Sequence, residues 1–142
     1  MSAPYQASGV AIAGPDGARG VLIEGPPGSG KSSLALALID RGAALIGDDG
    51  VLLEARDGRL WALPPPRIAG LLEIRNVGFA TLPAQAAPVA LVLRLDPAAP
   101  RHPETAEEAV LAGIGVPLIR LWPGAPALPL RAEWALTLYG TA

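Results

Sequence analysis

The chain has 142 residues, enough to bury one substantial core but few for a second domain, so we expect a single domain over residues 1–142. Its formal net charge is -2 and its Lys and Arg residues form no block, which argues against a nucleic-acid partner. With 1 His and no Cys, disulfides, thiol catalysis and the usual zinc sites are excluded.

The N-terminal residues predict a β-hairpin. Met1–Tyr5 has no basic segment followed by an apolar one, so we expect no signal peptide and a cytoplasmic protein. Ser8–Ile12 has the pattern of a strand, and Gly14–Gly17 has the composition of a turn. Gly20–Glu24 follows as a short buried strand, which completes the hairpin.

The next segment, Gly25–Ser32, fits the phosphate-binding loop (P-loop) pattern G-x-x-x-x-G-K-[ST] without a mismatch. It is followed by Leu34–Ile39, a strong helix-forming run, so the free amides at the helix N-terminus would point at an anion. Lys31 adds a positive charge, and the Ser32 hydroxyl is placed to reach a magnesium ion. A turn that merely joins a strand to a helix would not explain Lys31 and Ser32. We therefore interpret the segment as a nucleotide or phosphate site.

Two adjacent carboxylates follow the next predicted strand. Gly42 is expected to end the helix, and Ala43–Ile46 is a hydrophobic strand that leads to Asp48 and Asp49. Both carboxylates should emerge at the edge of the sheet that carries the P-loop, where ligands bind in α/β folds. An ordinary Asp-Asp-Gly turn is the alternative, but the neighbouring P-loop favours a functional pair.

The middle of the chain predicts a second hairpin and a mixed segment. Val51–Ala55 and Leu60–Leu63 flank Asp57-Gly58, which is a strong hairpin signal. Ile68–Phe79 mixes apolar and charged residues with two glycines. For this segment we expect a loop with a short strand at its start.

The rest of the chain predicts two strands separated by a short helix. Asn76–Leu93 is uncharged, but prolines interrupt it, so a buried central strand over Val89–Leu93 is favoured over a membrane span. We expect a short helix over Glu104–Leu111. Val116–Leu121 is the last strand, with Pro117 at its start or at a sheet edge.

A C-terminal helix is predicted from a spacing of four residues. Leu130, Trp134 and Leu138 recur at this interval, which indicates an amphipathic helix packing that face on the sheet. The only histidine, His102, lies between prolines in a polar stretch, and we expect it to be a solvated surface residue.

Three motifs in order resemble the catalytic domain of the bacterial HPr kinase/phosphorylase family: Gly25–Ser33, Leu45–Val51 and Gly70–Phe79. They read GPPGSGKSS, LIGDDGV and GLLEIRNVGF, and the family has a P-loop, a paired Asp motif and an L-L-E-I-R-G-x-G signature at similar spacing. The resemblance covers roughly Ser8 to Phe79 and is to short, single-domain proteobacterial versions. It implies an α/β fold, a P-loop-containing mixed sheet with flanking helices like that of HPr kinase and phosphoenolpyruvate carboxykinase. The whole of residues 1–142 would form this kinase domain.

The resemblance also implies an activity. It is that of an ATP-dependent protein serine kinase with a regulatory role, using ATP and Mg2+ to phosphorylate an HPr-like phosphocarrier protein of the phosphotransferase system. No nucleic acid and no membrane would take part, and because the family's catalytic domains often assemble, a homo-oligomer is allowed.

Roles carry over to the matching positions. Asp49 would be the general base, with Asp48 in a supporting role, and Arg75 lies in the signature that the family uses in both directions of its reaction. Glu73 would bind magnesium together with Ser32, although Glu73 and Arg75 alone would be interpreted as a solvated pair. Lys31 would contact the β and γ phosphates. The nucleotide-binding residues would be Gly25, Pro26, Pro27, Gly28, Ser29, Gly30, Lys31, Ser32 and Ser33.

The sequence departs from the family in two places that concern the reverse, phosphorolytic reaction. Gln6 stands where members usually carry a histidine, and Trp122–Pro126 does not match the arginine-containing motif tied to dephosphorylation. Arg101 aligns only loosely with a later family arginine. We therefore expect a kinase and regard the phosphorylase activity as doubtful.

Two other functions remain open from the sequence. A P-loop kinase for a small metabolite would need extra segments for a lid and a base-binding region, and few residues are left for them. A non-catalytic nucleotide-binding regulatory module would retain the phosphate site without turnover.

Overall fold

The structure is a computed structural model that describes residues 1–142 and contains two helices and eleven strands. The helices are α1 (Lys31–Asp40) and α2 (Leu128–Tyr139). The strands are β1 (Ser2–Tyr5), β2 (Ser8–Ile12), β3 (Arg19–Glu24), β4 (Ala44–Gly47), β5 (Val51–Arg56), β6 (Arg59–Leu63), β7 (Leu71–Ile74), β8 (Gly78–Thr81), β9 (Ala87–Leu95), β10 (Glu107–Leu111) and β11 (Ile114–Leu121).

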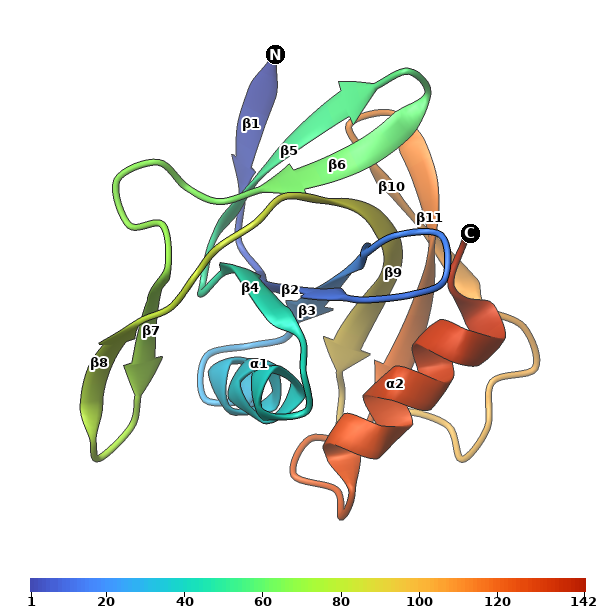
Figure 1. The fold of residues 1–142 in the computed structure, drawn as a ribbon. Helices are drawn as coiled ribbons and strands as arrows, with labels where there is room; N and C mark the ends of the chain where they lie inside the picture. The colour runs from blue at the N-terminus through green and yellow to red at the C-terminus, as the bar shows by residue number, and fades with distance from the viewer.

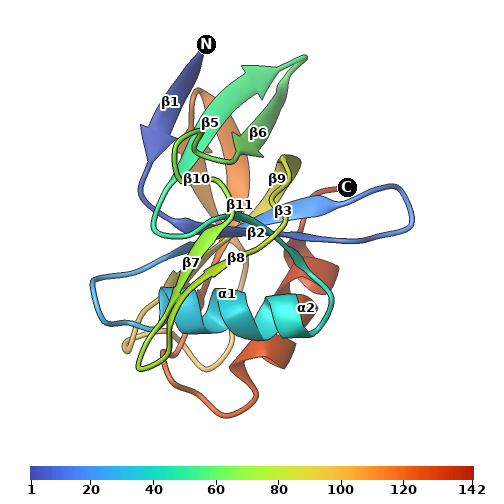
Figure 2. The ribbon, with the colours of Figure 1, turned by 60° about the vertical axis from the view of Figure 1, so that its left-hand side comes forward.

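The fold is a mixed α/β architecture with one curled, mixed sheet of nine strands and a separate two-stranded β7–β8 sheet. The main path of the large sheet is β1-β5-β6-β9-β3-β2-β4, and β11 joins β9 and carries β10. Figure 1 shows β1, β5 and β6 folded over one side of the central strands, with α1 and α2 on the other side. Turned by 60°, the β7–β8 hairpin is seen to extend past α1 (Figure 2). Neither helix has the length and apolar composition that crossing a bilayer requires.

Strand β9 lies at the centre because its side chains are apolar on both faces. Its residues enter two separate hydrophobic clusters. Leu91, Leu93 and Leu95 belong to the cluster that α1 and α2 cover, and Val92 points into the cluster closed by β5 and β6. A strand buried on both faces needs the continuous apolar run that this segment has.

A β-bulge within β9 reverses the face of the sheet toward which the following side chains point. In the pairing with β3, Gly20 lies opposite Val89 but Val21 lies opposite Leu91, so Ala90 is an extra residue. Val89 belongs to the cluster under β5 and β6, whereas Leu91, two residues on, belongs to the helix-covered cluster. The Ala90 carbonyl accepts a hydrogen bond from the Thr141 amide at 3.0 Å. The C-terminal tail thus satisfies a polar group at the bulge.

Strand direction gathers four chain segments at one edge of the sheet. β3, β9 and β11 are parallel, and β4 runs in the same direction because both β3 and β4 pair antiparallel with β2. The residues that follow these strands, Gly25, Asp96, Trp122 and Asp48, therefore leave from the same edge. The start of β2 lies there too, because Ser8 pairs with Ile23.

Most predicted elements are confirmed. Both hairpins, the strand–loop–helix order around the P-loop, the central strand and the C-terminal helix are present. Pro117 lies inside β11 and not at its start, at a position where β11 pairs only with β10 because pairing with β9 begins at Leu118.

The helix predicted over Glu104–Leu111 is wrong. Glu107–Leu111 forms β10, which pairs antiparallel with β11 through the two-residue turn Ala112-Gly113. Both turn residues have positive φ, 50° and 78°, as the tightest hairpin loops require. The apolar residues that pack inward, Ala109 and Leu111, alternate with exposed ones, which is the period of a strand.

The C-terminal helix is confirmed, but its buried face is not the predicted one. Leu130, Trp134 and Leu138 are exposed. The face that packs on the sheet is formed by Leu128, Ala132, Ala135 and Leu136. Their spacing follows the helical period closely, and the two alanines let the helix approach the sheet.

The segment Ile68–Phe79 is more regular than predicted. The short strand near its start is β7, but the remainder is not loop: β8 returns antiparallel to it, with Glu73 opposite Phe79. Asn76, with φ of 68°, turns the chain between the two strands. Asn adopts this left-handed conformation more readily than most residues.

The two faces of α2 give a matched stability test. Leu136 is 2% exposed and Leu138 is 67% exposed. We expect Leu136→Ala to lower the free energy of unfolding by about 2–5 kcal/mol because it leaves a cavity, and Leu138→Ala to change it by less than about 0.5 kcal/mol. Urea unfolding followed by circular dichroism measures both. Equal losses from the two variants would contradict the assigned face.

Candidate active site

The P-loop joins the carboxyl end of β3 to the first residue of α1. Gly28 and Gly30 have φ of 79° and 99°, a left-handed conformation that residues with a Cβ rarely adopt. The Ser29 amide closes a turn onto the Pro26 carbonyl at 3.1 Å. The helix then begins at Lys31, and the amides of its first turn remain available to an anion.

Lys31 folds back over this loop. Its Nζ donates hydrogen bonds to the carbonyl oxygens of Gly25 at 2.7 Å and Pro26 at 3.2 Å. The ammonium group is therefore held against the first two residues of the loop. A phosphate bound by this loop would be attracted by this cation.

Asp48 connects three segments at the sheet edge. Its Oδ1 accepts hydrogen bonds from Ser32 Oγ at 2.6 Å and from Ser8 Oγ at 3.3 Å, and its Oδ2 accepts one from the Glu73 amide at 3.2 Å. The P-loop, the start of β2 and the β7–β8 hairpin are thus linked through one half-buried carboxylate. Hydrogen bonds to an ionised acceptor are stronger than those between neutral groups.

Sequence reasoning missed Ser8. It is the one polar residue in the buried set, with no exposed surface. Its hydroxyl donates to Asp48 and accepts a hydrogen bond from the Asp49 amide at 3.4 Å. The sequence signal for Ser8 is a serine at the start of an apolar strand, in a hairpin that precedes a P-loop. This signal is weak unless the pairing of β2 with β4 is known.

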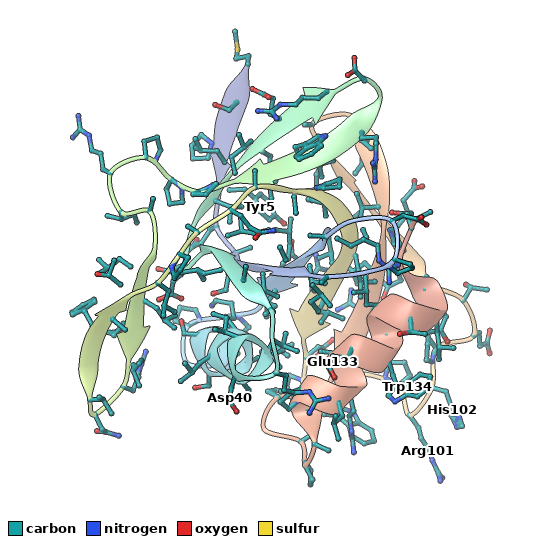
Figure 3. The ribbon with its side chains drawn as sticks, in the orientation of Figure 1. Tyr5, Asp40, Arg101, His102, Glu133 and Trp134 are labelled. Atoms are coloured by element: carbon teal, nitrogen blue, oxygen red, sulfur yellow. The ribbon has the colours of Figure 1, made fainter.

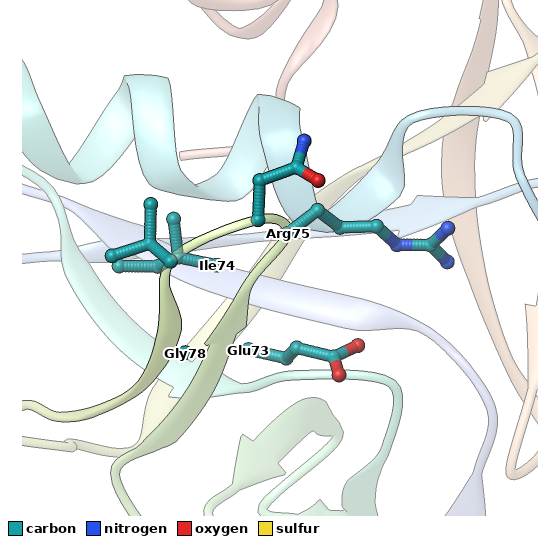
Figure 4. Close-up of a pocket in the computed structure, with 6 residues that line it drawn as sticks. Glu73, Ile74, Arg75 and Gly78 are labelled. Atoms are coloured by element: carbon teal, nitrogen blue, oxygen red, sulfur yellow. The ribbon is translucent and has the colours of Figure 1, made fainter.

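Asp49 and Arg75 are exposed, and neither side chain takes part in a hydrogen bond or ion pair within the chain. Asp49 has φ of 58°, so the backbone turns immediately after Asp48 and the two carboxylates diverge. Figure 4 shows the side chains of Glu73, in β7, and of Arg75, in the turn that follows β7, extending to the same side of the β7–β8 hairpin. Ser32, Asp48 and the backbone of Glu73 are therefore in contact, whereas the side chains of Asp49 and Arg75 are exposed and have no partner within the chain.

The other residues predicted for the site form no hydrogen bond with Asp48, and they differ in exposure. Ser33 is exposed on the first turn of α1, whereas the Ser29 hydroxyl is buried inside the loop without a hydrogen-bond partner. Gln6 is exposed beside Gly25 and Pro26. Arg101 and His102 are exposed on the loop before β10, away from the β7–β8 hairpin (Figure 3). No hydrogen bond or ion pair links Arg101 to the P-loop or the Asp pair.

Ion pairs occupy the part of the edge where β3, β9 and β11 end. Arg94 donates two hydrogen bonds to Glu24 Oε1, at 2.7 and 2.9 Å. Arg120 bridges Asp96 at 2.9 Å and Glu107 at 2.7 Å. The Ala98 amide and then Arg120 hold the pKa of Asp96 below its usual range, and the Arg120 hydrogen bond does the same to the pKa of Glu107. These carboxylates in turn raise the pKa of Arg120.

The donor atoms around Asp48 fit a hard divalent cation. The Ser32 hydroxyl and the Asp48 carboxylate are in contact, and Asp48 also accepts a hydrogen bond from the backbone amide of Glu73, whose exposed side chain carries a second carboxylate. No cluster of three or more acidic or histidine side chains is present. Such a set suits Mg2+, which takes one or two carboxylates and completes its shell with water and substrate phosphates.

The fold and this edge define a class of protein: a curled mixed sheet in which strand β3 leads into a loop with the P-loop sequence, beside a paired Asp motif. The model of the HPr serine kinase C-terminal domain family matches residues 8–84, which is more than half of the chain. A solved structure described as the HPr(Ser) kinase/phosphatase from Coxiella burnetii superposes with a TM-score of 0.81 at 28% identity, covering 95% of this chain and 88% of that one.

Curated relatives are described as proteins of the same kind. The HPr kinase/phosphorylase of Streptococcus thermophilus is 38% identical over 108 residues, 66% of this chain and 35% of that protein. That of Clostridium novyi is 45% identical over 57 residues, 40% of this chain and 19% of that protein. The chain thus spans about a third or less of these relatives. It belongs to the HPr serine kinase C-terminal domain family, and its mixed α/β fold is the one expected from the resemblance.

The Arg120 ion pairs predict a pH effect. A carboxylate with a lowered folded pKa stabilises the fold at pH values above its ordinary pKa, and this contribution is lost as pH falls through the folded value. For Asp96 and Glu107 that loss should begin below about pH 4. In an Arg120→Gln variant, NMR titration should show both pKa values moved upward, with a larger shift for Glu107 because Ala98 still holds Asp96. Unchanged titration of both groups would contradict the pairing.

Proposed function

We propose that the protein is an ATP- and Mg2+-dependent serine kinase that phosphorylates an HPr-like phosphocarrier protein. The proposal rests on family membership and on one observation: the P-loop serine, Ser32, is hydrogen-bonded to Asp48, which precedes Asp49 and accepts a hydrogen bond from the Glu73 amide of the β7–β8 hairpin. The hydrogen bond between Ser32 and Asp48 supports this proposal because it links the segment proposed to hold a triphosphate to the Asp pair proposed to accept a proton. Transfer of a phosphoryl group requires both functions.

The nucleotide phosphates would lie on the backbone amides of Gly25 to Ser33, with Lys31 on the β and γ groups. Lys31 Nζ lies against the Gly25 carbonyl at 2.7 Å, which keeps this cation on the loop proposed to hold the phosphates. The unpartnered Ser29 hydroxyl lies inside the same loop. These groups would neutralise the charge that develops on the transferred phosphoryl group.

Asp49 is proposed as the general base. The carrier's serine oxygen attacks the γ phosphorus, the bond from that phosphorus to the β–γ bridging oxygen breaks, ADP leaves, and the hydroxyl proton passes to the Asp49 carboxylate. Asp49 is exposed and has no partner within the chain, so an acceptor can approach it. Asp48, with three hydrogen bonds, is better placed to orient Ser32 and the hairpin than to take a proton.

Mg2+ would be held by Ser32 and Glu73 and would supply charge neutralisation between the β and γ phosphates when bound. Arg75 lies two residues from Glu73 on the same side of the hairpin, where it would face a negatively charged acceptor or phosphoryl group (Figure 4). The hairpin thus contributes both a carboxylate and a cation to the proposed site.

We propose the kinase direction and not the phosphorylase direction. Gln6, exposed beside the P-loop, cannot titrate in place of the histidine that the family resemblance leads one to expect. The Trp122–Pro126 segment likewise carries no arginine. A reaction that must protonate and bind inorganic phosphate lacks these groups here.

The direct test is transfer of label from γ-labelled ATP to a purified HPr-like carrier in the presence of Mg2+. We expect label on a serine of the carrier, located by mass spectrometry, and no transfer to the same carrier with that serine changed to alanine. ATP binding without transfer to any carrier would favour a non-catalytic nucleotide-binding module. Transfer to a small metabolite in its place would favour a metabolite kinase.

Asp49→Asn tests the base with a matched control. Asn tolerates the left-handed backbone at this position, so the change removes the proton acceptor and leaves the turn intact. We expect the rate of label transfer to fall by about 10²- to 10⁴-fold. Asp57 is also exposed and also has a left-handed backbone, with φ of 50°, so Asp57→Asn should transfer label at the wild-type rate. Wild-type transfer by Asp49→Asn would remove it from this role.

Glu73→Gln tests the proposed metal ligand. Loss of one carboxylate should raise the Mg2+ concentration that gives half-maximal transfer by about tenfold. Glu104, an exposed residue outside all ion pairs of the structure, supplies the control Glu104→Gln, for which the Mg2+ requirement should not move. If Glu73→Gln lowered the rate at every Mg2+ concentration with the same half-maximal value, Glu73 would not be a ligand.

A further inference from the structure

Two cavities meet the P-loop, and they differ in charge. One touches its start, at Gly25 and Pro26, and is lined by Glu24, Arg94, Asp96 and Arg120 among others. The other touches its second half, at Gly28 to Gly30, and includes Ser33 and Leu34 of α1. The second cavity has no charged residue in its wall, and its volume is about 570 Å³.

The walls of the uncharged cavity come from two separate segments. One wall is the P-loop with the first two turns of α1, ending at Ala37. The facing wall is the turn between β11 and α2, which supplies Pro123, Gly124 and Ala125, and the start of α2, which supplies Leu128 and Pro129. The cavity therefore opens directly from the amides that would hold the phosphates, with apolar and small residues on both sides.

A nucleoside triphosphate must place two different groups next to each other. Its phosphates need amides and a cation, and its base is a flat, uncharged ring that favours apolar surfaces. The charged cavity is a poor site for a base because its carboxylates and guanidinium groups are engaged in ion pairs. The uncharged cavity lies within the size range of small-molecule sites, and Gly28, Gly30 and Ser33 connect it to the phosphate site.

We propose that this cavity is the nucleoside pocket of the enzyme and that the turn Pro123–Ala125 forms its outer wall. The proposal rests on the proposed use of ATP and adds the location of the base and ribose. It also places the reacting side of the nucleotide opposite, toward Asp48, Asp49 and the β7–β8 hairpin. The segment Trp122–Pro126, which does not match the family's dephosphorylation motif, would then contribute to nucleotide binding.

The composition of the pocket limits its selectivity. Ser29 and Ser33 are the only lining residues with polar side chains, and the Ser29 hydroxyl is buried within the loop. Sites reject a wrong substrate strongly when a buried polar group would be left unpaired, and weakly when the wall is apolar. ATP and GTP should therefore bind with similar affinity.

The experiment compares ATP with inorganic tripolyphosphate, which has the phosphates but no nucleoside. Binding of each is measured by isothermal titration calorimetry in the presence of Mg2+. The wild-type protein should bind ATP about tenfold more tightly than tripolyphosphate, because only ATP fills the pocket. Ala37→Phe and Ala125→Phe each fill the pocket from one wall and should abolish this difference. Tripolyphosphate affinity should stay within about twofold of wild type, which also shows that the variants are folded.

Ala55→Phe is the matched control, because Ala55 is an exposed residue of β5, on the side of the molecule opposite α1 (Figure 1). It should retain the preference for ATP. Unchanged ATP preference in both pocket variants would overturn the proposal, as would an equal loss of both ligands. These binding measurements do not involve the carrier protein. If the expected binding pattern were found but no phosphoryl group were transferred, the proposed kinase function would be overturned and the proposed nucleoside pocket would be retained.

Discussion

Burial of β9 on both faces is the constraint on which the rest of the structure depends. A strand with water on neither side must be covered by two layers, and here α1 and α2 provide one while β5 and β6 provide the other. Its parallel neighbours β3 and β11 must then end where it ends. The carboxyl edge formed in this way is where the P-loop leaves the sheet. Backbone groups beyond the last hydrogen bonds between strands are free at such an edge, which is why α/β folds commonly bind ligands there.

At that edge, a single carboxylate holds together parts of the chain that are far apart in sequence. Asp48, which follows β4, accepts hydrogen bonds from Ser8, Ser32 and the Glu73 amide. These bonds fix the positions of the P-loop and the β7–β8 hairpin relative to the end of β4. The hairpin pairs with no strand of the large sheet, and this contact helps to hold it against α1. Asp49, the next residue, is left exposed. Two adjacent aspartates thus have different surroundings, one hydrogen-bonded and half-buried and one exposed to solvent.

Local patterns predicted much of this fold, and the exceptions have physical causes. The strand–loop–helix around Gly25–Ser32 and both hairpins follow from glycine placement and turn chemistry, which act over a few residues. Glu104–Leu111 was misassigned because a short amphipathic run does not distinguish a helix from an edge strand until β11 offers a partner. The buried face of α2 was misassigned because large apolar residues were favoured over Ala132 and Ala135. Ser8 could not be found, since its partners depend on the pairing of β2 with β4.

The β-bulge at Ala90 also determines where the chain tolerates a change in length. On either side of Ala90, alternate residues face opposite layers, and one extra or missing residue would move the side chains beyond it from one core cluster to the other, where they do not fit the packing. The turns at Gly14–Gly17 and Asp57-Gly58 carry no such restriction, because their residues are largely exposed and no core residue depends on their number. Insertions and deletions among related proteins should therefore fall in these turns and spare the segment from Ala87 to Leu95.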